Sequence, residues 1–255
     1  MTSNNLFHFD TSIAEPYNSR SQKARVMTED WVKKNVFCPN CGSSLKKHPN
    51  NKPVSDFYCP DCKEDFELKS KENNFSRKIA DGAYQSMLCR INSYKNPNFL
   101  FLNYSKNCVR NFFVIPKHFF VNDIIEKRNP LALSARRAGW IGCNILINNI
   151  PNNGKVFYIE NSTWVPREQI IDKYRKTKFL NTNIASRSWA VDIMKCIESL
   201  KKVDFELSDI YAFQDELKNR HPENNHINDK IRQQLQLLRN NGYLRFCGKG
   251  KYSIC

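Results

Sequence analysis

Residues 54–69 read VSDFYCPDCKEDFELK, and this stretch decides how the chain folds. Polar and apolar residues alternate at both of its ends, a pattern typical of two β-strands. Because side chains in a strand repeat every two residues, Glu67 and Lys69 share one face of the second strand, while Leu68 points to the other. Asp56 on the first strand can lie opposite them. The stretch is therefore expected to gather two carboxylates and one lysine on one face.

Two carboxylates that converge in this way form an oxygen site of the kind that Mg²⁺ prefers. A lysine beside the ion can orient the attacking water and lower its pKa, while the cation stabilises charge on the phosphorus oxygens. The sequence thus predicts a site for phosphodiester hydrolysis at Asp56, Glu67 and Lys69. The alternative is a set of solvated charges on a strand face, because a Glu-x-Lys pattern is common by chance.

Two Cys-x-x-Cys pairs surround the first predicted strand. They are Cys38 with Cys41 and Cys59 with Cys62, and seventeen residues separate the pairs. This is the spacing of a zinc ribbon or knuckle, in which four thiolates bind one Zn²⁺ and leave no open position for water. We expect a structural Zn²⁺ site, with free or disulfide-bonded cysteines as the alternative.

The chain is strongly basic. It has 40 Lys and Arg against 25 Asp and Glu among 255 residues, a formal net charge of +15. Such an excess favours a polyanionic partner. Since no run is apolar enough to cross a bilayer and no stretch pairs the charge with a wide apolar stripe, nucleic acid is expected rather than a membrane. With neither a secretory signal nor a span, the protein is expected in the cytoplasm.

Periodicity divides the chain into two regions. Residues 1–183 are expected to form a mixed α/β domain, and residues 184–255 a smaller helical one, with a linker near residues 181–187. In the first region we expect a helix capped by Ser21 that carries Ala24, Met27 and Trp31, a second helix over Ser76 to Tyr94, and buried strands over residues 98–104, 111–115 and 155–159.

The C-terminal region has the order of a winged helix. Three short apolar stripes carry Trp189, Ile193, Ile197 and Leu200, then Ile210, Phe213 and Leu217 behind a predicted cap at Ser208, then Ile227, Ile231, Leu235 and Leu238. A hairpin with Gly248-Lys249-Gly250 at its turn follows. In such a domain the third helix reads base edges and the wing meets phosphates. The predicted DNA contacts there are Asp229, Arg232 and Gln233, with Lys249 and Lys251 on the wing, although such residues are common on any exposed surface.

Eight short motifs are spread over nearly the whole chain: Ser-Gln-Lys-Ala-Arg (21–25), Thr-Glu-Asp-Trp-Val (28–32), the Cys-Pro-Asn-Cys knuckle, Asp-Phe-Tyr-Cys (56–59), Phe-Glu-Leu-Lys-Ser-Lys (66–71), Asp-Gly-Ala-Tyr (81–84), Arg-Arg-Ala-Gly-Trp-Ile-Gly-Cys-Asn (136–144) and Ile-Arg-Gln-Gln-Leu (231–235). Together they resemble the family of DpnI-like restriction endonucleases.

The resemblance implies a PD-(D/E)XK nuclease core with the four-cysteine zinc knuckle inserted, followed by a winged helix. It implies Mg²⁺-dependent cleavage of double-stranded DNA at GATC sites whose adenine is N6-methylated. The catalytic roles would fall on Asp56, Glu67 and Lys69, with the Leu68 carbonyl as a further metal ligand. One departure is that the usual Pro-Asp pair reads Ser55-Asp56, with Pro53 three residues before the aspartate.

The resemblance also gives Trp140 a role as an apolar wall near the methyl group of the target adenine, with Arg136 and Arg137 beside it on the DNA. A core tryptophan is the alternative. Two alternative functions stay open for the whole chain: the same fold acting on unmethylated or otherwise modified DNA, and a zinc-ribbon and winged-helix regulator without catalysis.

Overall fold

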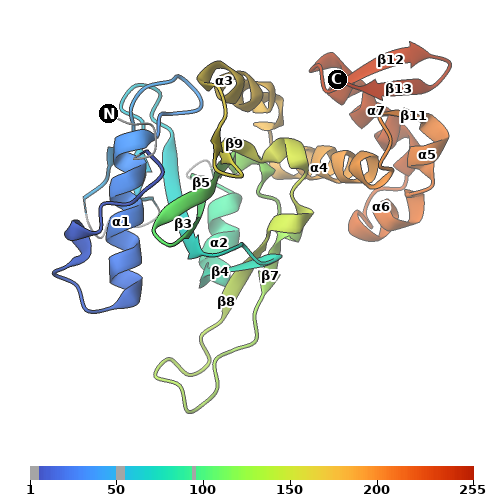
Figure 1. Cartoon of the computed structure of the whole chain (residues 1–255). Coiled ribbons are helices and arrows are strands. Elements are labelled where there is room, and N and C mark those ends of the chain that lie inside the picture. The colour runs from blue at the N-terminus through green and yellow to red at the C-terminus, as the bar shows by residue number, and fades with distance from the viewer. Residues whose placement is uncertain (1–5, 50–54, 94–95) are drawn as a thin grey trace.

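The structure is a computed structural model that describes residues 6–49, 55–93 and 96–255. Pro53 and Val54 lie outside the described residues. The chain forms an α/β region and a C-terminal helical region, which lie side by side (Figure 1). Helix α4 (Ile184–Ser199) runs between the two. Of the described residues, none belongs to a helix with the length and apolar character needed to cross a bilayer.

A seven-stranded sheet is the centre of the α/β region. Its strand order is β1-β2-β3-β5-β6-β9-β10. The strands are β1 (Lys46–Lys47), β2 (Phe57–Tyr58), β3 (Asp65–Glu72), β5 (Asn98–Ser105), β6 (Cys108–Ile115), β9 (Val156–Glu160) and β10 (Thr163–Trp164). β3 and β5 run parallel, whereas the other neighbours are antiparallel. The predicted strands are therefore confirmed, although β2 is shorter than expected and Asp56 directly precedes it.

The central strands bury both faces, so their sequences are nearly continuous apolar runs. Leu100 and Leu102 of β5 pack in the core beneath helices α1 (Arg20–Asn35) and α3 (Arg167–Lys176). Phe99 and Phe101 alternate with them and pack on the opposite side, against α2 (Tyr84–Ile91) and α4. Strand β3 is the parallel neighbour of β5 and follows the same alternation. The side chain of each β3 residue therefore lies on the same side of the sheet as that of its β5 partner.

Helix α1 begins slightly before the predicted start. Ser19, not Ser21, occupies its N-cap position, and its side chain makes no capping bond. The predicted apolar stripe is confirmed, because Met27 and Trp31 are buried. Trp31 packs against Phe112, with ring centroids 5.5 Å apart.

The predicted helix over Ser76 to Tyr94 is wrong in its first half. Residues Lys78–Ala83 form strand β4, and α2 begins only at Tyr84. Ile79 and Ala83 have helical spacing, but β4 pairs with β8 (Gly142–Leu146), and that pairing overrides the local preference. β8 also pairs with β7 (Ile125–Lys127), which makes a three-stranded sheet in the order β4-β8-β7.

The C-terminal region has the predicted winged-helix order, with one helix more. The second predicted helix is divided into α5 (Leu207–Tyr211) and α6 (Gln214–Arg220), followed by α7 (Ile227–Asn240). Ser208 is not the cap of α5: Glu206 occupies the cap position and forms a capping box with Asp209. Strands β11 (Asp204–Glu206), β13 (Lys251–Ile254) and β12 (Leu244–Gly248) complete the wing. All three residues of its turn, Gly248 to Gly250, have positive φ, as predicted for the glycines.

Helix α4 packs against both regions. It buries residues on nearly every side, including Trp189, Ile193 and Met194, as expected of a helix surrounded by protein. The buried Arg187 at its start donates hydrogen bonds to the carbonyls of Ile91 and Phe120 in the α/β region. One apolar core therefore runs from α2 through α4 into α7.

Candidate functional site

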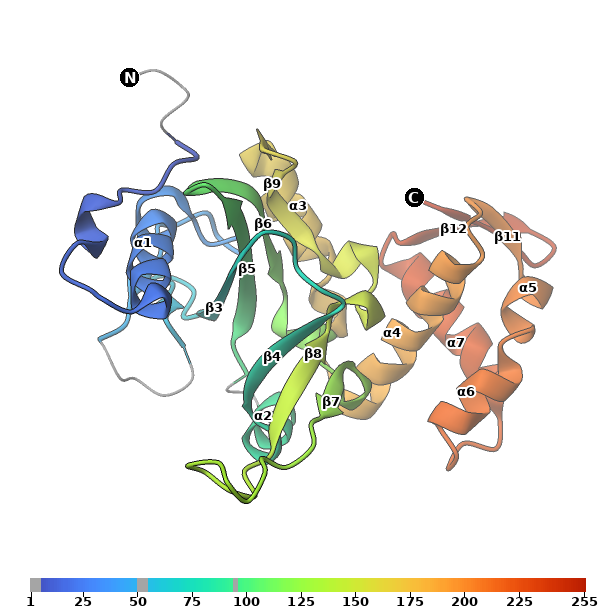
Figure 2. The same ribbon diagram turned by 60° about the horizontal axis from the view of Figure 1, so that its bottom comes forward.

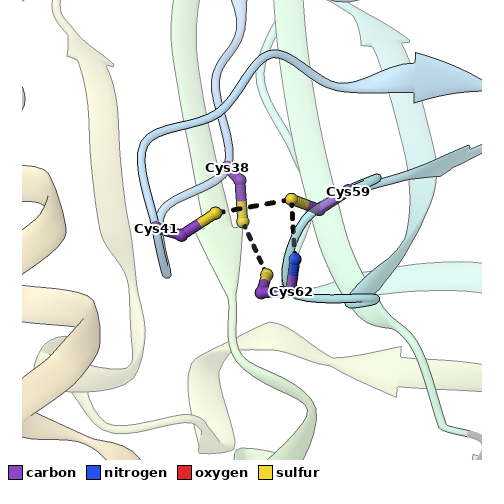
Figure 3. A group of neighbouring side chains, drawn as sticks. All are labelled: Cys38, Cys41, Cys59 and Cys62. Atoms are coloured by element: carbon purple, nitrogen blue, oxygen red, sulfur yellow. Dashed lines mark hydrogen bonds between the residues drawn. The ribbon is translucent and has the colours of Figure 1, made fainter.

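The four predicted zinc cysteines meet at one point (Figure 3). Their sulfur atoms all lie within 4.8 Å of one another, with Cys38 and Cys62 at 3.5 Å and Cys41 and Cys59 at 3.4 Å. A disulfide would need about 2 Å. A tetrahedral Zn²⁺ with bonds of about 2.3 Å separates its sulfurs by roughly 3.8 Å, so the cluster has the size and the ligand set that Zn²⁺ requires.

The thiols of this cluster differ in acidity. Burial raises the pKa of Cys38, whereas contacts with Ser43 and the neighbouring thiols outweigh burial and lower the pKa of Cys41 to about 6. Zn²⁺ binds thiolates, so it would deprotonate the whole set. Arg175 of α3 donates a hydrogen bond of 3.0 Å to the Asn40 carbonyl in the first knuckle, and Arg167 bonds the carbonyl of Gly42. These hydrogen bonds thus connect α3 to the knuckle that precedes β1.

Asp56 lies beside β3, immediately before β2 begins, and its N–H donates a hydrogen bond of 2.9 Å to the Phe66 carbonyl. Its Oδ2 accepts a hydrogen bond of 2.7 Å from the backbone N–H of Leu68. Burial raises the pKa of Asp56, and the bond from Leu68 opposes that shift. Positive charges on Lys69 and on Arg25 of α1 also act on this carboxylate. Asp56 is therefore held beside the backbone of Leu68, the residue whose carbonyl is the further expected metal ligand.

Glu67 and Lys69 share the face of β3 that looks toward α2 and β4, as the sequence predicts. Lys69 Nζ lies 2.6 Å from Glu67 Oε1. On its other side the ammonium contacts Asp81 Oδ1 of β4 at 2.5 Å. Glu67 Oε2 contacts Arg90 of α2, also at 2.5 Å. Two acidic and two basic side chains thus alternate in one row.

This row is largely withdrawn from solvent. The side chains of Lys69, Glu67 and Asp81 are 18%, 15% and 5% exposed. Burial raises the pKa of Glu67, although Lys69 and Arg90 oppose the shift. The pKa of Lys69 is raised despite burial, because the carboxylates of Glu67 and Asp81 favour its charged form. The lysine is therefore held as an ammonium between two carboxylates.

Two residues of this row, Asp81 and Arg90, are not predicted as site residues by any local pattern in the sequence. Oδ1 of Asp81 accepts from Lys69 and from the N–H of Gly82, whereas Oδ2 is buried and has no hydrogen-bond partner among the residues that the structure describes. A buried carboxylate oxygen without a partner is costly, and a ligand or ion that supplies one removes this cost. Asp81 belongs to a motif quoted above, but no local spacing connects it with Lys69.

A metal ion could be held here by oxygen atoms of Asp56, Glu67 and the Leu68 peptide. Among the described residues, the four cysteines form a group whose ligand atoms all lie within 4.8 Å of one another. The carboxylates do not form a group of three or more that is as close. The ammonium of Lys69 lies between Glu67 and Asp81 and provides the positive charge there. A divalent cation at Glu67 would therefore compete with Lys69 and Arg90 for its oxygens.

The predicted DNA-reading residues fall on two separate surfaces. Arg136, Arg137 and Trp140 lie in the connection between β7 and β8, where the Arg137 guanidinium covers the Trp140 ring at 4.7 Å. Trp140 is half-buried rather than a core residue. The other group is exposed on the C-terminal region: Asp229, Arg232 and Gln233 on α7, with Lys249 and Lys251 on the wing. Arg232 already has partners, Asp229 at 3.0 Å and the Tyr211 hydroxyl at 2.5 Å.

Family models account for both regions of the chain. The model of the Dam-replacing family, DpnI, matches residues 5–183. This chain belongs to that family. The model of the Dam-replacing HTH domain matches residues 185–253, over the helices and wing described above. Membership of the DpnI family indicates a restriction nuclease that binds DNA, and it agrees with the large sheet, the four-cysteine cluster and the C-terminal helix-turn-helix region.

Proposed function

We propose that this protein is a Mg²⁺-dependent type II endonuclease that cleaves double-stranded DNA at GATC sites with N6-methylated adenine. The observation that carries the proposal is the contact of Lys69 with Glu67, on a largely buried strand face, in a chain of the DpnI family. The same restriction nuclease fold acting on DNA with other modifications, or with none, is the nearest alternative. The site in this proposal has a PD-(D/E)XK arrangement.

In phosphodiester hydrolysis a water oxygen bonds to phosphorus while one phosphorus–oxygen ester bond breaks. The water must lose a proton, and the departing sugar oxygen must gain one. Bound Mg²⁺ would supply a positive charge for the phosphate oxygens and would acidify water. The residues to hold it are Asp56, Glu67 and the Leu68 carbonyl.

The other roles belong to the chain itself. Lys69 is fixed by two carboxylates, so its ammonium has a single orientation from which it can hydrogen-bond a water or a phosphate oxygen. Arg90 holds the second oxygen of Glu67 and thereby fixes the direction of the carboxylate. Asp56 is held in the same way by the Leu68 N–H. Fixed groups of this kind need little reorganisation when the substrate binds.

For the Zn²⁺ site we propose a purely structural role. Four thiolates complete the coordination of the ion and leave no position for a substrate. The cluster contacts α3, and Cys59 and Cys62 lie between β2 and β3, next to Asp56, so its binding energy supports the position of that carboxylate. The expected consequence is that zinc loss unfolds this corner and removes cleavage indirectly.

The decisive experiment is a digest of one plasmid prepared from cells with and without adenine methylation at GATC. We expect fragments only from the methylated plasmid, and only with Mg²⁺ present; EDTA should stop the reaction. Cleavage of both plasmids would support the alternative specificity and contradict the proposed one. If the protein cut neither plasmid but bound DNA tightly, it would be a regulator instead.

The variant Lys69→Ala tests whether the proposed active site, and not DNA binding alone, is responsible for cleavage. The variant should bind the methylated duplex with an affinity close to that of the wild type and should not nick it. Lys71→Ala is the matched control, because Lys71 lies on the same strand and is exposed. Equal nicking by Lys69→Ala and the wild type would refute the catalytic role of Lys69.

A further inference from the structure

The connection between β7 and β8, residues 128–141, is an ordered finger that projects from the α/β region (Figure 2). Backbone hydrogen bonds join its two sides. Arg128 N–H donates to the Gly142 carbonyl at 3.0 Å, and Leu131 N–H donates to the Trp140 carbonyl at 2.9 Å. The two sides of the finger therefore lie next to each other near its base, and residues 133–139 form the turns at its tip.

The tip of the finger presents an apolar side chain to solvent. Leu133 is 94% exposed, the highest value among the exposed large apolar residues of the described chain. The positions around it carry Arg128, Arg136 and Arg137, all exposed, and residues 127–141 contain no acidic residue. An apolar tip surrounded only by positive charge fits an anionic partner that also offers apolar groups, and DNA bases within a phosphate backbone are such a partner.

The base of the finger is joined to the proposed catalytic row. Asp81, which contacts Lys69, pairs with Cys143 in the β4–β8 ladder. The next pair along the ladder is Ala83 with Gly142, where the finger begins. The Tyr84 N–H also donates to the Ile141 carbonyl at 3.1 Å. A duplex held by the finger would therefore be held in a fixed relation to Lys69.

Trp140 lies at the root of the finger rather than at its tip. Its ring covers Gly142 so closely that a Cβ there would lie 2.8 Å from it, and the Arg137 guanidinium covers the ring. The tip therefore reaches farther from the sheet than Trp140 does. Leu133 is the large apolar side chain that the tip exposes, so it is the residue placed for an apolar contact deep in a groove.

We propose that the finger enters the major groove of the substrate duplex and places Leu133 against methyl groups on the base edges. This inference rests on the proposed function. The major groove is about 12 Å wide and admits two chain segments side by side, whereas the minor groove is only about 6 Å wide. In the major groove the apolar groups are the thymine C5-methyl and, at a modified site, the adenine N6-methyl. Leu133 is thus a specificity-determining contact additional to Trp140.

The test is fluorescence anisotropy of the full-length protein with labelled duplexes, without added Mg²⁺ so that no strand is cut. The three duplexes carry the methylated GATC site, the unmethylated site, and the methylated site with deoxyuridine in place of thymidine. Leu133→Ala is compared with the wild type and with Leu6→Ala, the same change at another exposed leucine. Because Leu133 is so exposed, its removal should leave thermal unfolding unchanged.

We expect Leu133→Ala to bind the methylated duplex on the order of tenfold more weakly, as for loss of a buried leucine contact, and Leu6→Ala to bind as the wild type does. If the variant also loses the preference for thymidine over deoxyuridine, Leu133 contacts the C5-methyl. If it loses the preference for methylated adenine, Leu133 contacts the N6-methyl.

Unchanged binding and unchanged preferences in Leu133→Ala would overturn the inference. The inference would also be overturned if Leu133→Ala without DNA had a lower mass in sedimentation than the wild type, because the tip would then bind a second copy of the chain. The plasmid digest is independent of this comparison. If the wild type binds the duplexes but cuts no plasmid, the proposed function is wrong. The anisotropy of Leu133→Ala would still decide the role of the finger.

Discussion

Lys69→Met tests the charge balance of the proposed active site without relying on catalysis. In the wild type the ammonium lies 2.6 Å from Glu67 and 2.5 Å from Asp81. Methionine keeps much of the length and volume of the side chain and removes its charge. Among the described residues, Glu67 then keeps its ion pair with Arg90, while Asp81 loses its ion pair with Lys69.

The expected loss of stability follows from the burial of this row. Removing one partner of a buried ion pair costs about 3–5 kcal/mol, because the remaining charge stays desolvated. The side chains here keep a small exposed fraction, so we expect the lower end, roughly 3 kcal/mol. For a chain of this size that lowers the midpoint of thermal unfolding by about 6–12 °C.

Mg²⁺ should reverse part of this loss. Without Lys69 as a competitor, a divalent cation at Glu67 restores the missing positive charge, so added Mg²⁺ should raise the unfolding midpoint more in Lys69→Met than in the wild type. Binding at about 100 times the dissociation constant stabilises by about 2.7 kcal/mol. Thermal scans with Mg²⁺ or EDTA measure both effects, with Lys71→Met on the exposed part of β3 as the control. If Mg²⁺ shifts neither protein, the assignment of these carboxylates to a metal site is refuted.

Three further predictions concern other parts of the chain. Cys41→Ser should reduce bound zinc and lower the unfolding midpoint, whereas Cys247→Ser, another exposed cysteine, should change neither; metal analysis and thermal scans decide. Burial lowers the pKa of His118 to about 3, so between pH 6.5 and 3 the unfolded chain binds a proton that the folded chain does not, and stability falls by about 1.4 kcal/mol per pH unit as the solution is acidified. His118→Gln should remove this contribution. Urea titrations at pH 6.5 and 5.5 measure it, and an equal change in the free energy of unfolding for the variant and the wild type would contradict it. Arg136→Gln should weaken DNA binding similarly for all sequences and reduce the salt slope by about one, as measured by anisotropy at several salt concentrations.

Local periodicity was enough to predict the strands and helices whose apolar side chains pack in the core. The runs now seen as β5, β6 and β9 are strands of one sheet, and the stripes of α4 and α7 are buried helix faces. The cysteine spacing predicted the cluster, since its geometry depends on two short knuckles. In these cases the short-range pattern and the tertiary contacts favour the same structure.

Prediction failed where a distant strand decides the outcome. Ile79 and Ala83 fit a helical stripe, and only β8, some sixty residues later in the chain, makes their segment a strand. The same pairing brings Asp81 to Lys69, so the strand assignment and the missing site residue have one cause. Arg90 reaches Glu67 from α2 for a similar reason.

The shared core around α4 limits how far the two family-defined regions can be treated as exchangeable parts. Its buried side chains insert between the α/β region and α7, so a chain cut after residue 183 would uncover apolar surface on both fragments. Grafting the C-terminal helices onto another nuclease would require transplanting the surface that receives α4 as well. New specificities in this protein are therefore more accessible through changes in surface loops than through recombination of whole segments.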